Sequence, residues 1–78
     1  MLRIYNPRIR MQILTIIAEN KPTVYELNEI GADRGWFKYK NVHTLRNHIY
    51  ELINTGSIVP EYKEEEKVTR FKITYQLT

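Results

Sequence analysis

Polar side chains of different chemical kinds stand close together between residues 43 and 50, inside a stretch that also repeats aliphatic residues. They are an imidazole, a hydroxyl, a guanidinium, an amide and a phenol, carried by His43, Thr44, Arg46, Asn47 and Tyr50. Together these groups can donate and accept hydrogen bonds in many combinations. We therefore expect them to face outward and to meet whatever lies outside the fold.

Metal binding and catalysis are the other uses of such residue types, and the sequence favours neither. His43 and His48 are five residues apart, whereas two ligands on one helical face need a separation of three or four. The chain has no cysteine, which excludes disulfides, thiol nucleophiles and Cys-based zinc sites. Ser-His-Asp sets and Gly-rich phosphate loops are also absent from the sequence. We expect no enzymatic activity, no metal site, no cofactor and no small-molecule ligand.

Length and charge limit the remaining possibilities. The 78 residues are expected to form a single domain, 1–78, with a small core. No apolar run approaches the ~20 residues that cross a bilayer, so we expect no membrane partner and a cytoplasmic location. The net charge of +3 fits a polyanionic partner without requiring one.

A first helix is predicted over about residues 7–19, after an Asn6-Pro7 start. Its isoleucines recur at helical spacing and predict a buried face: Ile9, Ile13, Ile16 and Ile17. A weaker stripe occupies its other side: Met11, Leu14 and Ala18. A helix that is apolar on two sides either lies centrally or joins a second copy, so a homodimer stays open. Residues 2–5 are compatible with a short strand.

A second helix is predicted over about residues 23–31. Thr23 and Glu26 have the spacing of a capping box, in which each side chain satisfies a free backbone donor of the other residue. Gly31 is the expected terminator, because glycine enters the left-handed conformation cheaply.

The polar residues of the first paragraph belong to a third predicted helix, over about residues 40–55. Its aliphatic residues repeat at intervals of three and four, and Gly56 ends the pattern. They are Val42, Leu45, Ile49, Leu52 and Ile53. At 100° per residue Asn47 and Tyr50 lie opposite this buried face. His48 borders the buried stripe, so we expect it to pack rather than to bind a partner.

Two antiparallel strands are predicted over about residues 57–63 and 68–77, because apolar and polar residues alternate there. Pro60 lacks a donor for the ladder, so the first strand is expected at an edge. The turn between the strands carries three carboxylates, Glu64, Glu65 and Glu66.

Three helices followed by a hairpin resemble the winged helix-turn-helix family. The residues that carry the resemblance are Ile13-Leu14, Glu26-Leu27, the run from Thr44 to Leu52, Gly56-Ser57-Ile58-Val59 and Phe71-Lys72-Ile73-Thr74. The resemblance covers the chain from about Pro7 to Thr74. It implies an α+β fold in which the hairpin is the wing.

The resemblance also implies a function, sequence-specific binding of double-stranded DNA by a transcriptional regulator. The third helix would lie in the major groove as the recognition helix, and the wing would touch the backbone. The candidates for reading bases are His43, Thr44, Arg46, Asn47 and Tyr50. Asn47 is the best placed, because an amide can bond bidentately to adenine.

Basic residues outside the third helix are candidates for phosphate contacts. They lie in the loop over residues 31–41, which is longer than the turn usual in this family, and along the wing: Arg34, Lys38, Lys40, Lys63, Lys67, Arg70 and Lys72. In the loop Trp36 is expected to pack. The acidic wing tip would be repelled by phosphates, which argues against deep insertion of the tip into the minor groove.

Two other functions remain open. Winged helices also serve as protein-protein interaction modules in larger assemblies, and the acidic wing tip and the Met11, Leu14 and Ala18 stripe would suit that use. RNA binding ranks below both, because no platform for single strands is evident in the sequence. The target site, the sign of regulation and the source are not specified by the sequence.

Overall fold

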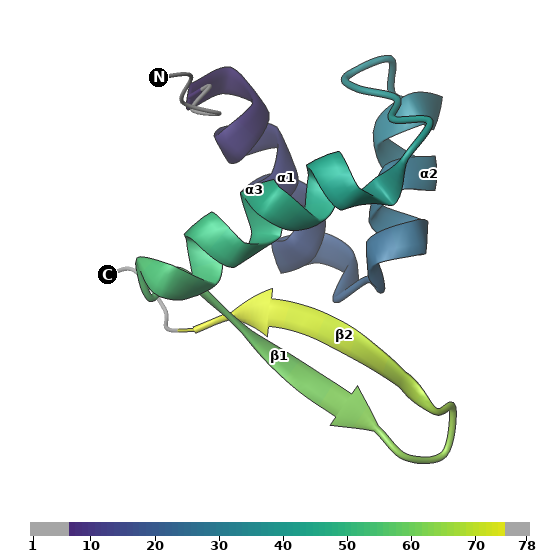
Figure 1. The fold of residues 1–78 in the computed structure, drawn as a ribbon, viewed down its shortest axis with the longest axis vertical. Helices are drawn as coiled ribbons and strands as arrows, with labels where there is room; N and C mark the ends of the chain where they lie inside the picture. Colours follow the sequence, from purple (N-terminus) through teal and green to yellow (C-terminus); the bar gives the residue numbers. More distant parts are fainter. Residues whose placement is uncertain (1–6, 75–78) are drawn as a thin grey trace.

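A computed structural model of the protein describes residues 7–74 (Figure 1). Three helices precede one antiparallel hairpin in that range: α1 (Pro7–Asn20), α2 (Val24–Asp33), α3 (Val42–Asn54), β1 (Ile58–Lys63) and β2 (Val68–Ile73). The α+β class and the order of the elements are confirmed, and the layout is compatible with a winged helix.

Two predicted boundaries, the end of α2 and the start of α3, were wrong. Helix α2 continues through Gly31 to Asp33. Helix α3 begins after Lys40, because the side chain of Asn41 caps it by accepting a hydrogen bond from the His43 N–H at 2.9 Å. Strand β2 ends at Ile73. The predicted strand at residues 2–5, the N-cap Asn6 and the continuation of β2 over 75–77 lie outside the described residues.

Position 31 needs a glycine because a ring packs against it, and not because the chain reverses there. A Cβ at this position would overlap the ring of Phe37, which lies directly against the α2 backbone. The backbone of Gly31 also accepts hydrogen bonds from the N–H groups of Trp36 and Phe37, at 2.9 and 3.3 Å. The reversal itself uses Gly35, whose φ of 72° lies in the left-handed region.

The core fills the space between the three helices, where α3 crosses in front of α1 (Figure 1). It is made of aliphatic side chains and one ring: Ile13, Ile16, Ile17, Val24, Leu27, Phe37, Leu45, Ile49, Leu52 and Ile58. The predicted buried faces of α1 and α3 are therefore confirmed. The second stripe of α1 is covered less completely, and 61% of Met11 is exposed.

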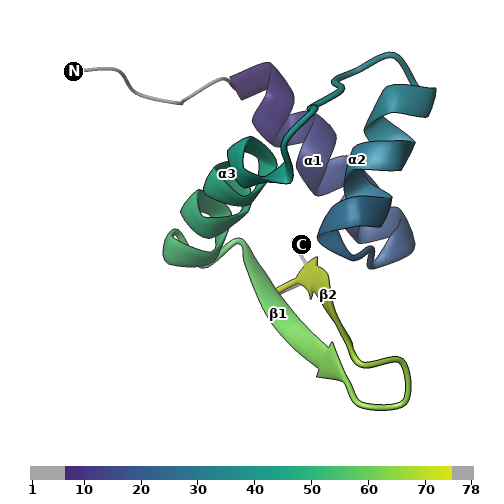
Figure 2. The same ribbon diagram turned by 45° about the vertical axis from the view of Figure 1, so that its right-hand side comes forward.

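The hairpin projects away from the helices, as the turned view in Figure 2 shows. Its register pairs Ile58 with Ile73 and Lys63 with Val68. Outside the hairpin, the N–H of Phe71 donates to the carbonyl of Pro22 at 3.0 Å, so β2 also pairs with the linker between α1 and α2. This bond fixes the hairpin beside the start of α2.

Candidate nucleic-acid interface

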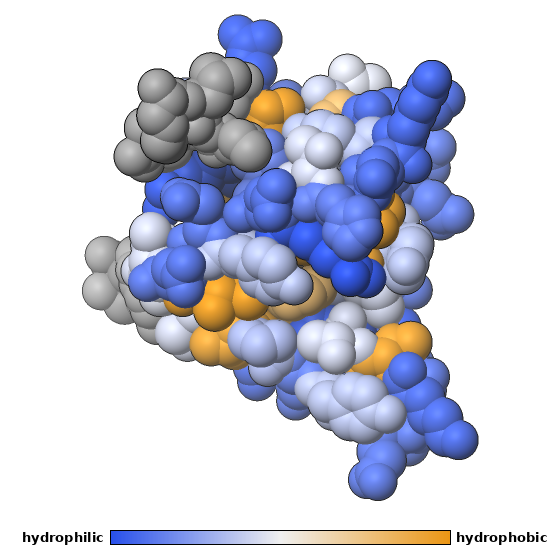
Figure 3. Space-filling model, viewed as in Figure 1, coloured by the Kyte–Doolittle hydropathy of each residue, from blue (hydrophilic) through white to orange (hydrophobic). Residues whose placement is uncertain are grey.

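Helix α3 presents one polar face to the outside. Leu45 and Ile49 are completely buried beneath it. His43, Thr44, Asn47 and Tyr50 are exposed, and Arg46 is half-buried at the edge of this face. The space-filling view shows hydrophilic side chains in a band across the same side of the molecule (Figure 3). The predicted orientation of α3 is therefore confirmed.

His48 belongs to the packing of the fold. Only 8% of it is exposed, and its ring centroid lies 6.2 Å from that of Tyr39. Burial lowers the pKa of its imidazole, while the nearby charge of Glu51 acts in the opposite direction. The predicted packing role is confirmed.

The loop between α2 and α3 is held by the side-chain amide of Asn28. Its Nδ2 donates to the carbonyl of Tyr39 at 2.9 Å, and its Oδ1 accepts from the Tyr39 N–H at 3.1 Å. The two bonds fix the strand-like backbone just before α3. Burial also raises the pKa of the Tyr39 phenol. Sequence reasoning missed Asn28, because its spacing to residue 39 matches no local motif.

The three basic residues of this loop fall into two groups. The guanidinium of Arg34 lies 2.7 Å from a carboxylate oxygen of Glu19 and 5.0 Å from the ring centroid of Trp36. Its charge is thus already engaged within the protein. Lys38 and Lys40 are exposed, and neither has an ion pair within residues 7–74.

Lysines of the hairpin share one carboxylate. The Nζ atoms of Lys63 and Lys72 lie 3.5 and 3.8 Å from the two carboxylate oxygens of Glu61. Ion pairs this exposed contribute little to stability and exchange easily with another anion. Lys67 is exposed in the turn, with a φ of 58°, and takes part in none of the ion pairs found in the described range.

Arg70 was a candidate for a phosphate contact, but its guanidinium is already paired with carboxylates of the protein. Its guanidinium lies 2.7 Å from Glu26 and 2.8 Å from Glu66, and it also donates to the carbonyl of Lys21 at 3.2 Å. The hydrogen bond from Arg70 holds the pKa of the Glu26 carboxyl below its usual range, against the opposing effect of desolvation. Arg70 therefore joins the hairpin to the capping box of α2, and we leave it out of the interface.

The acidic turn of the hairpin points away from the helices (Figure 2). Glu64 and Glu65 are exposed there, whereas Glu66 folds back onto Arg70. The turn closes through N–H bonds from Glu66 and Lys67 to the carbonyl of Lys63. Two carboxylates are thus left for contact with solvent.

A groove of about 470 Å³ runs between α3, the start of α2 and the hairpin. Its walls carry two exposed tyrosines, Tyr25 and Tyr50, of which 61% and 56% is accessible. Arg46 and Lys67 also line it. Tyr62 pairs with Thr69 of the groove wall in the hairpin register and is 61% exposed. Sequence reasoning did not group these residues, because they come from three separate elements.

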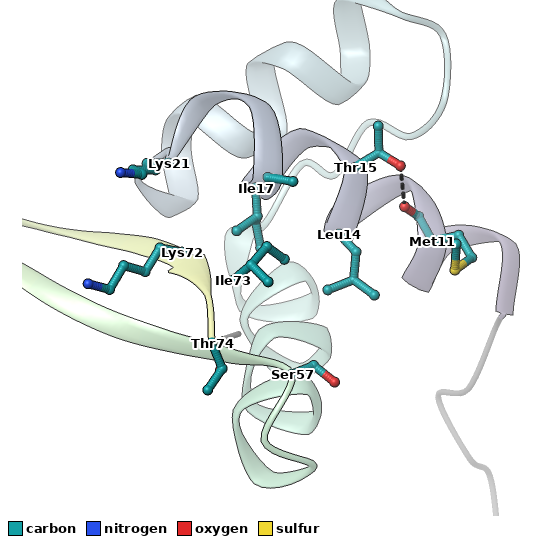
Figure 4. Close-up of a pocket in the computed structure, with 10 residues that line it drawn as sticks. Met11, Leu14, Thr15, Ile17, Lys21, Ser57, Lys72, Ile73 and Thr74 are labelled. Atoms are coloured by element: carbon teal, nitrogen blue, oxygen red, sulfur yellow. Dashed lines mark hydrogen bonds between the residues drawn. The ribbon is translucent and has the colours of Figure 1, made fainter. Parts of the chain in front are cut away.

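A second, larger groove of about 850 Å³ lies between α1 and the end of β2 (Figure 4). Apolar side chains of α1 face Ile73 across it, and Lys21 and Lys72 stand at one end. The stripe predicted from Met11, Leu14 and Ala18 lines this groove.

Known chemistry and known relatives add little to this picture. Within the described residues no three His, Asp or Glu side chains gather as a metal site would require. None of the three helices there has the length and apolar character needed to cross a bilayer. No protein-family model, curated protein or solved structure matches the chain.

Proposed function

We propose that the protein is a winged-helix, sequence-specific DNA-binding protein that places α3 in the major groove and acts as a transcriptional regulator. The observation that carries the proposal is the division of α3 into two faces. Leu45, Ile49 and Leu52 are buried and hold the helix rigidly, while Asn47 and its neighbours stay accessible. A rigid helix with mixed donors and acceptors on its outer face suits the hydrogen-bond pattern of base edges.

Unpaired positive charge near the start of α3 supports this proposal. Lys38, Lys40 and Arg46 take part in none of the ion pairs within residues 7–74, so no partner has to be displaced before they meet phosphate. The first turn of α3 adds the positive end of its helix dipole. Phosphate contacts of this kind fix the register of a protein on the duplex.

The hairpin would contribute backbone contacts from its side. Lys63, Lys67 and Lys72 are the cations available for this, whereas Arg70 is committed to Glu26 and Glu66. Glu64 and Glu65 at the tip would be repelled by phosphates. We therefore place the tip outside the minor groove.

Fluorescence anisotropy with duplexes enriched from random DNA tests the proposal. Asn47→Ala should reduce the affinity difference between the selected duplex and a scrambled one, by ~5- to ~150-fold if one bidentate base contact is lost. Asn54→Ala removes the same amide two turns later, beyond the N-terminal part that reads bases, and should leave the difference intact. Equal affinity of the unmodified protein for both duplexes would refute sequence-specific binding.

Protein-protein interaction is a second candidate, favoured by the apolar groove between α1 and β2. Met11 is largely exposed there beside Leu14 and Ile73, an arrangement that suits a partner's apolar side chains (Figure 4). A duplex titration at low salt separates the candidates, since a DNA-binding protein of this charge should show at least nonspecific, salt-sensitive affinity. Absence of that affinity would favour the interaction module. Sedimentation of Met11→Asp beside the unmodified protein tests whether the groove forms a homodimer.

A further inference from the structure

We propose that the groove between α3, the start of α2 and the hairpin binds an unpaired stretch of DNA strand, with bases stacked on its tyrosines. This goes beyond the proposed reading of base pairs by α3, and it does not require that reading. The groove lies beside the outer face of α3, and only Arg46 and Tyr50 belong to both surfaces.

Exposed aromatic rings are the first observation. Tyr25 of α2 and Tyr50 of α3 line the groove, and Tyr62 of β1 pairs with Thr69 of its wall; more than half of each tyrosine is accessible. None of them contributes to the hydrophobic core. Aromatic rings that line a groove and remain accessible are the platforms on which unpaired bases stack, whatever the base.

The groove floor is the second observation. It includes apolar side chains of α3 and the hairpin that keep some exposed surface: Ile53, Pro60, Val68 and Phe71. Such a floor suits the faces of a base, which are apolar, better than it suits the phosphates. The volume of about 470 Å³ falls within the ~300–1,000 Å³ of sites that hold one small ligand, so a nucleotide unit fits.

Charge is the third observation. Arg46 and Lys67 line the groove, and no carboxylate does. Of the nearby acids, Glu66 and Glu26 are bonded to Arg70. Cations beside aromatic rings fit a strand that alternates phosphates with bases, whereas an apolar peptide would gain nothing from the two cations.

Titration of a labelled oligothymidylate by fluorescence anisotropy at low salt tests the proposal. Each of Tyr25→Ala and Tyr50→Ala should weaken binding about five-fold or more, which is the loss of one stacked base. Tyr25→Phe and Tyr50→Phe keep the ring and should bind nearly as well as the unmodified protein. Met11→Ala is the control: Met11 is exposed and lines the other groove, between α1 and β2.

Several results would overturn the proposal. These are no binding of oligothymidylate, no effect of either alanine variant, or equal losses for alanine and phenylalanine, which would mean that the hydroxyl rather than the ring makes the contact. Binding unaffected by salt would also overturn it, because the phosphates of the strand would then make no contact with Arg46 or Lys67.

Tyr25 separates this proposal from the proposed function. It lies on α2 and is not among the residues proposed to read bases, although Arg46 and Tyr50 of that set line the same groove. Tyr25→Ala should therefore leave discrimination between duplexes intact, while Asn47→Ala should leave oligothymidylate binding intact. If Tyr25→Ala weakens only duplex binding, the groove holds paired DNA and the proposal fails, although the proposed function stands.

Discussion

The guanidinium of Arg70 lies 2.7 Å from the carboxylate of Glu26, and this pair connects the second strand of the hairpin to the first turn of α2. Glu26 also accepts the N–H of Thr23 at 3.3 Å in the capping box. One carboxylate thus serves both the start of a helix and the attachment of the hairpin. It attaches the hairpin beside the start of α2 together with the bond from the Phe71 N–H to the Pro22 carbonyl.

Removal of either partner should lower the thermal unfolding midpoint. Glu26→Gln keeps an acceptor for the capping box and removes mainly this ion pair, whereas Arg70→Met keeps the aliphatic stem but also removes the contacts with Glu66 and the Lys21 carbonyl. The double variant should unfold close to the worse single variant, because the second change removes nothing further. Additive losses, measured by circular dichroism, would mean that the two residues act independently.

The same pair predicts a dependence on pH. The pKa of Glu26 is lowered in the folded protein, so the stabilisation is present above its unfolded value of about 4.5. It is lost as the pH falls through the lower folded pKa, where the carboxyl takes up a proton. Urea unfolding between pH 5 and pH 3 should show a smaller fall in stability for Glu26→Gln than for the unmodified protein. Parallel curves would exclude this role.

His48 should make the stability of the fold depend on pH in a higher range than Glu26 does. Burial lowers its pKa below about 6.5, so the unfolded chain binds the proton more readily than the folded protein does. Stability should be at its full value above pH 6.5 and should fall as the pH decreases through the folded pKa. His48→Phe should flatten urea-unfolding stability over this range, whereas His43→Phe at an exposed position should keep the slope. An unchanged slope in His48→Phe would contradict the prediction.

Gly31→Ala should destabilise the protein by overlap with Phe37. Overpacking of this kind costs ~1–3 kcal/mol. Phe37→Leu provides space, so the double variant should lose less than the sum of the two single losses. Chemical unfolding followed by Trp36 fluorescence reports on the same loop. Simple additivity would show that the loss in Gly31→Ala does not come from overlap with the Phe37 ring.

Lys40→Ala should weaken binding to every duplex and make it less dependent on salt. Loss of one phosphate contact should reduce the slope of log affinity against log salt by about 1. Lys21→Ala is the matched control, because Lys21 lines the groove between α1 and β2. Equal slopes for all three proteins would remove Lys40 from the interface.

The sequence predicts local features of this fold well, since spacing decides them. Leu45 and Ile49 were placed on the buried side of α3 because helical periodicity leaves no other arrangement, and the Thr23–Glu26 capping box formed as expected. The prediction that Gly31 ends α2 was wrong. A glycine can also be required inside a helix, where a ring from another part of the chain packs against the backbone.

Contacts between side chains far apart in the sequence could not be predicted from it. Arg70 looked like a phosphate contact because its strand alternates, and nothing in that alternation reveals a carboxylate 44 residues earlier. The groove tyrosines stayed ungrouped for the same reason. Tyr25 and Tyr50 line one groove only after α2 and α3 have packed.

The amide of Asn28 imitates a neighbouring β-strand, since it offers Tyr39 one donor and one acceptor as a peptide group would. The segment that enters α3 is therefore held against α2 by its backbone, without a second strand. The two bonds consequently hold the backbone that leads into α3 at a fixed place beside α2.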